Sequence, residues 1–290
     1  MIQSKQIQWF PGHMAKTKRL IRESMSLVDI VIEILDARIP YASHNPDIEK
    51  LAESKPKLIL LNKASLAAPE ASAKWREYYK SKGTECLFTD CNTGEGLGDI
   101  MPKVNSILAE KLARYSERGM QGRALKALVV GIPNSGKSTF INRMAGSVKA
   151  KAENRPGVTR DKQWVPTKHG LDLLDTPGVL WPKFEEKLVG ENLAITGAIK
   201  DMILDQEEIA CLLIKRLRSI APETLISRYK LTEDDLDEAY IDYDVLEAIG
   251  RKRGFLMSGG AINTERTAIT LLEEFRSGKI GRITLELPNV

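Results

Sequence analysis

The amino-acid sequence predicts an α/β fold with a mostly parallel sheet, followed by a smaller, mainly helical C-terminal domain. Short apolar runs rich in Val, Ile and Leu alternate with helical patterns up to about residue 200. Beyond about residue 206, helical patterns dominate. The chain has 290 residues, enough for two domains that each bury a core. We therefore expect a basic N-terminal segment at 1–22, an α/β domain at 23–200 and a helical domain at 206–290.

The strands expected in the first domain are short apolar runs that end at polar residues. They lie at 29–35, 57–61, 85–89, 124–130 and 171–174. Strands that alternate with helices form parallel sheets, and ligands bind such sheets beyond the carboxyl ends of the strands. Between the first two strands, Pro40, Asn45 and Pro46 predict a loop.

The helices are expected from apolar residues at helical spacing. In the first domain they lie at 69–82, 97–113 and 139–145, and Gly83 marks a plausible end of the first of them. The second domain is expected to have helices at 207–220, 222–230, 233–253 and 264–277. A short strand at 283–287 is expected to close the chain.

Composition excludes several classes of protein. Hydrophobic residues make up 42% of the chain and charged residues 28%, as in ordinary soluble proteins. No apolar run approaches the roughly 18 residues that span a bilayer, and the N-terminus lacks the apolar stretch of a secretory signal. Three irregularly spaced cysteines fit neither a disulfide framework nor a zinc site. We expect a cytoplasmic monomer without a membrane partner.

The net charge of +4 is unevenly distributed. Residues 1–22 carry five basic residues and no acidic one, and a second basic stretch runs from Lys149 to Lys168. Between Glu233 and Glu247 there are eight acidic residues and no basic one. Such segregation is typical of a protein that presents a positive face to a phosphate backbone. The alternative interpretation is a set of solvated helix faces.

A phosphate-binding motif lies between an expected strand and an expected helix. Residues 131–138 (GIPNSGKS) match the pattern G-x-x-x-x-G-K-[ST], in which glycines let successive backbone amides surround phosphate oxygens. Lys137 is expected to reach the β- and γ-phosphates, and the Ser138 hydroxyl to bind Mg²⁺. The expected nucleotide contacts in this motif come from Asn134, Ser135, Gly136, Lys137, Ser138 and Thr139.

Two further segments complete the phosphate site. Asp175-Thr176-Pro177-Gly178 follows the next apolar strand, where a carboxylate can hold a Mg²⁺-bound water and the Gly178 amide can meet the γ-phosphate. Between the two motifs, Thr159 lies in a basic loop and is expected to bind Mg²⁺ and to support catalysis when that loop closes. The order and spacing of the three segments predict a switch that responds to a nucleoside triphosphate.

The base-binding motifs come before the phosphate motif. Asn62-Lys63-Ala64-Ser65 resembles the guanine-binding motif N-K-x-D with its last position changed, and Asp90-Cys91-Asn92-Thr93-Gly94 resembles the loop that contacts the guanine carbonyl. In N-K-x-D the Asn supports the site, the Lys stem lies along the base and the Asp accepts hydrogen bonds from guanine. The order of base motifs, phosphate loop and switches is typical of circularly permuted GTPases, in which every strand keeps its neighbours while the chain ends move.

The sequence closely resembles the bacterial ribosome biogenesis GTPase A family. The resemblance covers nearly the whole chain and is carried by the motifs above and by segments 8–14, 36–40, 175–184, 196–200 and 253–260. It implies a Mg²⁺-dependent GTPase that binds a late precursor of the large (50S) ribosomal subunit and its rRNA. The family also implies contact with that RNA through the helical domain, and release once GTP has been hydrolysed to GDP.

Two positions depart from the motifs. Ser65 stands where N-K-x-D has a carboxylate, so we expect a guanine preference weakened by about tenfold, equivalent to ~1.4 kcal/mol. Val179 stands where related enzymes often have a water-positioning glutamine, so the catalytic group must come from elsewhere. His13 is our candidate, and the alternative is a structural or RNA-contacting histidine.

Asn134 and the basic segments each allow two interpretations. Asn134 resembles the residue that holds K⁺ beside the phosphates in some GTPases, or it stabilises a turn after Pro133. Trp9 and Phe10 lie beside the basic residues Lys16, Lys18, Arg19 and Arg22 and are expected to contact RNA. Two other functions stay open: a P-loop NTPase with relaxed base specificity, and an RNA-binding scaffold with little hydrolysis.

Overall fold

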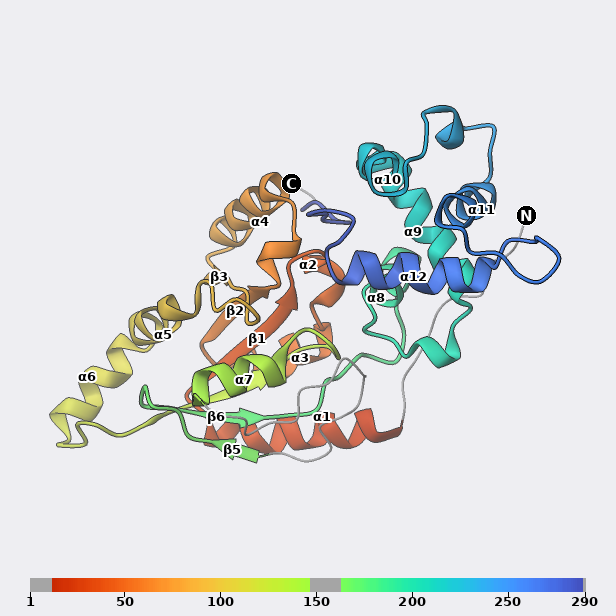
Figure 1. Ribbon diagram of the computed structural model, residues 1–290. Coiled ribbons are helices and arrows are strands. Elements are labelled where there is room, and N and C mark those ends of the chain that lie inside the picture. The colour runs from red at the N-terminus through yellow and green to blue at the C-terminus, as the bar shows by residue number, and fades with distance from the viewer. Residues whose placement is uncertain (1–11, 147–162, 289–290) are drawn as a thin grey trace.

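A six-stranded sheet forms the centre of the α/β part of the molecule (Figure 1). The computed structural model describes residues 12–146 and 163–288. The strand order is β3-β2-β1-β4-β6-β5, and all neighbouring strands are parallel except β5 and β6. The strands are β1 Ile30–Asp36, β2 Lys57–Asn62, β3 Cys86–Phe88, β4 Leu125–Val130, β5 Gln163–Val165 and β6 Leu171–Asp175. The five expected strands are confirmed, and β5 is an additional edge strand.

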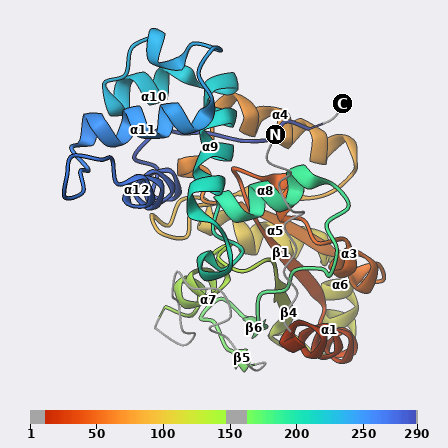
Figure 2. The ribbon, with the colours of Figure 1, turned by 90° about the vertical axis from the view of Figure 1, so that its right-hand side faces the viewer.

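Helices cover both faces of the sheet. Alternate residues of β1 point to opposite faces, so Ile32 packs on one side and Val31 on the other. The face of Ile32 is covered by α5 (Ile100–Ile107) and α7 (Lys137–Ala145). The opposite face is covered by α1 (Gly12–Ser24), α3 (Pro46–Ala52) and α4 (Pro69–Ser81), as Figures 1 and 2 show.

The chain reverses its winding direction between the two central strands. From β1 the sheet grows through β2 to β3 on one side, and from β4 it grows to β6 on the other. In such sheets the crevice beyond the carboxyl ends of the two central strands is the usual ligand site. The residues that follow β1 and β4 are therefore the first to consider for function.

The part of the chain that begins at Lys187 is mainly helical and packs directly on the α/β part. Its helices are α8 Lys187–Ile195, α9 Gln206–Ile220, α10 Pro222–Tyr229, α11 Asp242–Arg253 and α12 Thr264–Arg276. The Asp205 carboxylate caps α9 by accepting from the amides of Glu207 and Glu208. One continuous cluster of buried side chains extends from Met14 in α1 to Phe275 in α12. Among the described residues, no helix is long and apolar enough to cross a membrane.

Three local predictions were wrong or incomplete. The loop expected around Pro40 and Pro46 contains α2 (Pro40–Ser43) and α3, and each of these helices starts at a proline, where the missing amide costs nothing. The helix expected at 97–113 breaks at Leu108 into α5 and α6 (Ala109–Glu117). The helix expected at 233–253 begins only at Asp242, after a 3₁₀ turn at Asp234–Leu236.

The expected strand at 283–287 does not form. This C-terminal tail instead crosses back to the α/β part and ends near α4 (Figure 1). The amides of Ile283 and Leu285 donate to the carbonyls of Leu66 (2.9 Å) and Arg38 (2.8 Å), both of which lie outside the sheet. The Trp75 indole of α4 donates to the Glu286 carbonyl (3.1 Å). The tail is therefore hydrogen-bonded, but its partners are a 3₁₀ turn, a turn after β1 and a helix rather than a strand.

Candidate nucleotide-binding site

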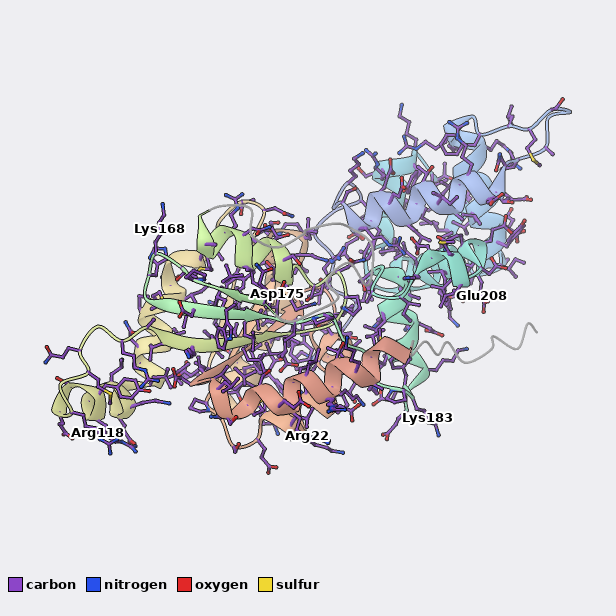
Figure 3. The ribbon with its side chains drawn as sticks, turned by 90° about the horizontal axis from the view of Figure 1, so that it is seen from below. Arg22, Arg118, Lys168, Asp175, Lys183 and Glu208 are labelled. Atoms are coloured by element: carbon purple, nitrogen blue, oxygen red, sulfur yellow. The ribbon has the colours of Figure 1, made fainter. Side chains whose placement is uncertain are left out.

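Most of the predicted site residues gather at one edge of the sheet. Asn62 ends β2, Gly131 follows β4 and Asp175 ends β6, while Asp90 lies two residues after β3. These strands are parallel, so their carboxyl ends meet at the same edge. Figure 3 shows Asp175 near the middle of the molecule, at the end of β6 that is nearer the helical C-terminal part.

The phosphate loop has a backbone that only glycine accommodates at two positions. Gly131 has φ +151°, and a Cβ there would lie 2.4 Å from the Ile34 carbonyl oxygen. Gly136 has φ +100°, and its Cβ would lie 2.2 Å from Asn62 Nδ2. Asn134 has φ +59°, which asparagine tolerates better than most residues. The loop leads directly into α7 at Lys137, so the N-terminus of a helix points at the place where phosphates would bind.

Lys137 is buried, and its ammonium donates to a loop carbonyl. Its Nζ lies 2.8 Å from the Ile132 oxygen. Burial lowers the pKa of Lys137 to about 8, although the charge of Asp175 opposes the change. A bound phosphate would supply the negative charge that this buried ammonium lacks.

Asp175 is a buried acidic group whose charge is opposite to that of Lys137. Burial raises its pKa to about 6, while Lys137 and the Thr176 amide oppose the change. Its Oδ1 atom is buried and has no hydrogen-bond partner among the residues that the structure describes. Ser138, in the first turn of α7, is half-buried. A carboxylate oxygen without a partner and a hydroxyl are the hard ligands that Mg²⁺ or its bound water prefers, so these residues fit the ion. Thr159 lies outside the described residues.

The segment after Asp175 is folded against the phosphate loop. The Val179 amide donates to the Gly131 carbonyl (3.3 Å), and the Val179 carbonyl accepts from Asn45 Nδ2 (3.0 Å). A Cβ on Gly178 would lie 2.8 Å from the Pro133 nitrogen and 3.0 Å from Lys137 Nζ. Only glycine therefore fits at 178 in this arrangement. The Val179 side chain is 1% exposed and belongs to the core.

Asn62 joins the phosphate loop (131–138) to the second base-binding loop (90–94). Its Nδ2 donates to the Ser135 carbonyl (2.8 Å), and its Oδ1 accepts from the Cys91 amide (3.0 Å). The side chain is 2% exposed. Cys91 meets Asn62 through its backbone, while burial raises the pKa of the Cys91 thiol to about 12. The Asn62 side chain therefore links the phosphate loop to the loop that contains Cys91.

Lys63 is anchored by residues that sequence analysis missed. It has φ +61°, and its Nζ donates to Asp36 Oδ2 (2.9 Å) at the end of β1. Asp36 also binds the buried Arg38 guanidinium in a bidentate pair (2.8 and 3.0 Å). Burial opposes ionisation of Asp36, but Arg38 and Lys63 hold its pKa well below the ordinary value. The sequence holds two signals for these residues: Asp36 and Arg38 are charges at the end of an apolar run, and both lie in segment 36–40, which carries part of the family resemblance.

Ser65 and Asp90 form a hydrogen-bonded pair across the two base loops. The Ser65 hydroxyl donates to Asp90 Oδ2, and Asp90 Oδ1 accepts from the amides of Asn92 (2.8 Å) and Thr93 (3.1 Å). Asp90 is 2% exposed, whereas Ser65 is half-buried. The residue that departs from N-K-x-D therefore has a carboxylate beside it.

Asn134 and His13 are the remaining candidates, and the structure describes the side chain of Asn134 but not that of His13. Asn134 Nδ2 donates to the Gly197 carbonyl (2.6 Å), in the segment after α8, so its amide is engaged with the protein. The His13 backbone belongs to the first turn of α1, but its side chain, like Trp9 and Phe10, lies outside the described residues.

Comparison with known proteins decides the family. A family model described as "50S ribosome-binding GTPase" matches residues 126–238. The chain is 46% identical to ribosome biogenesis GTPase A of Bacillus pumilus over 97% of this chain and 99% of that one. The chain belongs to the ribosome biogenesis GTPase A family. It is a GTPase with circularly permuted motifs, because its base motifs precede the phosphate loop while the strands keep the expected neighbours.

More distant relatives and solved structures agree with this assignment. The Thermotoga maritima ribosome biogenesis GTPase A is 31% identical over 97% of this chain and 95% of its own. The GDP-bound structure of TM YlqF matches with a TM-score of 0.64 at 27% identity, covering 93% of this chain and 99% of that one. GNP-bound YlqF from T. maritima matches with a TM-score of 0.63 at 26% identity, covering 94% and 99%.

Proposed function

We propose that this GTPase binds a late precursor of the large (50S) ribosomal subunit, promotes its maturation and leaves after hydrolysing GTP to GDP. One observation carries the proposal: the segment that follows Asp175 runs without interruption into α8 and the helical C-terminal part. A change in the γ-phosphate contacts at Gly178 therefore acts on the start of the helical part. The resemblance to ribosome biogenesis GTPases supplies the particle on which this movement acts.

Two basic regions support contact with rRNA. α1 carries Lys16, Lys18, Arg19 and Arg22, and the last turn of α11 carries Arg251, Lys252 and Arg253. Segment 1–22 and the helical domain at 206–290 would both contact RNA. Phosphate contacts by lysine and arginine give binding that weakens steeply with salt. We expect the protein to act as a monomer in the cytoplasm.

The ions that the site would hold follow from its ligands. Ser138 and Asp175, the latter through water, would bind Mg²⁺, and Thr159 would join them as the third group. The ion would neutralise phosphate charge, while Lys137 and the loop amides hold the phosphates in place. Asn134 would hold K⁺ only if its contact with Gly197 is exchanged. Turnover measured in K⁺ and in Na⁺ salts tests that assignment.

Co-sedimentation with large-subunit precursors tests the proposed function. The protein should sediment with the precursor in a GTP analogue, and should be released in GDP and without nucleotide. Hydrolysis by the protein alone should be slow and should rise when the particle is added. Equal sedimentation in all three nucleotide states, with no stimulation, would contradict the proposal. Raising the salt concentration should weaken the complex, and a flat response would indicate docking through protein alone.

A further inference from the structure

We propose that the Ser65 hydroxyl recognises guanine as a hydrogen-bond acceptor, and that Asp90 is the positioning residue that fixes it in that role. The inference rests on the proposed GTPase function and specifies how the base is chosen. The starting observation is that the Ser65 hydroxyl donates to the Asp90 carboxylate, at the position where N-K-x-D has a carboxylate of its own.

Cross-loop hydrogen bonds hold the two residues together. On one side of Asp90, the Thr89 carbonyl accepts from the Ala64 amide (3.0 Å). On the other side, the Cys91 amide donates to Asn62 Oδ1 (3.0 Å). Asp90 therefore lies between two bonds that tie its loop to the N-K-x-S turn, so its pairing with Ser65 is set by the fold of both loops.

The C-terminal tail holds the same turn from the other side. The Ile283 amide donates to the Leu66 carbonyl (2.9 Å), and the Arg282 guanidinium donates to the carbonyls of Ala67 (3.0 Å) and Ala64 (3.2 Å). Gly278 packs so closely that a Cβ there would lie 2.6 Å from Leu66 Cδ2. Ser65 is therefore presented from a turn that is fixed on two sides.

The hydrogen-bond arrangement determines what Ser65 can offer a ligand. An ionised carboxylate only accepts hydrogen bonds, so the single hydroxyl proton of Ser65 is committed to Asp90. The lone pairs of Ser65 Oγ are what remain for the base. Asp90 itself is 2% exposed and its other oxygen is occupied by two backbone amides, so Ser65 is the group that a base can reach.

This arrangement favours guanine over adenine for a chemical reason. The edge of guanine recognised by N-K-x-D carries two donors, N1–H and the N2 amino group, whereas adenine has an acceptor at N1. A hydroxyl whose proton is already donated to Asp90 can only accept, so it pairs with the guanine donors and not with adenine N1. The negative charge behind the hydroxyl also strengthens its oxygen as an acceptor, as in other charge-assisted chains. The Ser65–Asp90 pair thus offsets part of the loss of guanine preference that is expected from serine alone.

The test variant is Asp90→Asn in the full-length protein. The Asn oxygen can still accept from the Asn92 and Thr93 amides, so the turn is preserved. Its Nδ2 then donates to Ser65 Oγ, which frees the hydroxyl proton to point at the base. We expect the ratio of ADP to GDP dissociation constants to fall by about tenfold, equivalent to ~1.4 kcal/mol. The matched control is Asp99→Asn, an exposed carboxylate whose side chain caps no helix, and it should leave the ratio unchanged.

A second variant keeps the test independent of folding effects. Ser65→Ala removes a half-buried hydroxyl and should lower the ratio to a similar extent. If Asp90 acts through Ser65, adding Asp90→Asn to Ser65→Ala should not lower it further. The inference would be overturned if Asp90→Asn left the ratio of ADP to GDP dissociation constants unchanged. It would also be overturned if Asp90→Asn lowered that ratio as much in the Ser65→Ala protein as in the wild type. Neither result would affect the GTPase assignment. Wild-type protein that binds neither diphosphate would refute both.

Discussion

At the scale of single residues, the site contains two buried charged groups whose environment is incomplete without a ligand. Burial moves the pKa of Lys137 down to about 8 and the pKa of Asp175 up to about 6. Each charge is the main compensation for the other within the protein. Phosphates beside Lys137 and a cation near Asp175 would restore both ordinary ionisation states. The free protein thus holds its binding groups partly desolvated in advance.

Nucleotide affinity should therefore depend on pH through Lys137. Bound phosphate raises the pKa of Lys137, so binding takes up a proton above about pH 8 and weakens as pH rises. GDP affinity should fall roughly tenfold between pH 7 and pH 9. In Lys137→Arg the arginine stays charged throughout this range. The GDP affinity of the variant, whatever its value at pH 7, should therefore not fall tenfold between pH 7 and pH 9. Titration calorimetry on both proteins measures this, and parallel pH profiles would contradict it.

A second residue-scale prediction concerns catalysis. The Val179 side chain has no polar atom and is buried in the core, so it cannot position a water beside the γ-phosphate. We predict that His13→Ala lowers hydrolysis on the ribosomal particle by about 100-fold, the usual contribution of a general base, while GDP affinity stays the same. Single-turnover hydrolysis with and without particles measures the effect. Unchanged turnover on the particle would remove His13 from the mechanism.

Sequence patterns predicted where several candidate site residues lie in the fold, but not the contacts between them. Strand ends and motif spacing placed Asn62, Asp90 and Asp175 at one edge, because parallel strands all end there. The pairing of Ser65 with Asp90 was missed because the two are 25 residues apart and neither has a pattern that requires the other. Asp36 was missed as the partner of Lys63 for the same reason.

At the scale of elements, prediction succeeded where a local pattern was long or strongly apolar. The central strands are largely buried and are apolar apart from Glu33 and Asp36 in β1 and Lys126 in β4, so their apolar runs were found. β5 has three residues and forms because it pairs with β6, which its own sequence does not reveal. The tail at 283–287 has the alternating pattern of a strand, but its partners are turns and a helix.

The C-terminal tail makes a testable contribution to stability. Glu286 accepts from the amides of Tyr41 (2.8 Å) and Ala42 (3.1 Å) and from Asn192 Nδ2 (2.8 Å), which joins the tail to α2 and α8. Burial outweighs these bonds and raises the pKa of Glu286 from 4.5 to about 7. The folded state therefore holds this proton more tightly than the unfolded chain, and its contribution to stability falls as pH rises from 4.5 to 7.

Glu286→Gln should remove that pH dependence. The Gln oxygen can accept from the two backbone amides, and its amide can donate to Asn192 Oδ1, which is buried and has no partner within 12–146 and 163–288. Subtracting the free energy of unfolding of the variant from that of the wild type should give a difference that declines by up to about 1.4 kcal/mol per pH unit between pH 5 and pH 7. Denaturant titrations at several pH values measure it. A constant difference would show that Glu286 stays ionised.

At the scale of the whole molecule, two chains of contacts join the nucleotide site to α12. In the first, Asn134 of the phosphate loop donates to Gly197, and a Cβ on Gly197 would lie 3.2 Å from the Arg276 guanidinium. In the second, Lys63 binds Asp36, which binds Arg38, and Arg38 lies over the Phe275 ring at 5.3 Å. Both end in the last turn of α12. The buried core is also continuous, so the helical part packs against the α/β part as well as contacting the nucleotide site through these side chains.

Arg276 is the residue whose replacement should separate binding from communication. Its guanidinium donates to the carbonyls of Ala194 and Ile195 (both 2.9 Å) and pairs with Asp201 (2.7 Å), which fixes α12 to the end of α8. Arg276→Met keeps the length of the stem but loses these bonds. In the part of the chain that the structure describes, none of its hydrogen-bond partners lies in the phosphate loop or the base loops, so GDP affinity should stay within about twofold.

The expected effect of Arg276→Met is on how nucleotide state controls binding to ribosomal particles. The ratio of particle affinities in GTP analogue and in GDP should approach one, because α12 no longer follows α8 when the switch changes. Arg251→Met, an exposed basic change on α11, serves as the comparison and should weaken binding in both states alike by removing a phosphate contact. Quantitative co-sedimentation in both nucleotides measures the ratio. A variant that keeps the wild-type ratio would show that coupling runs through the core alone.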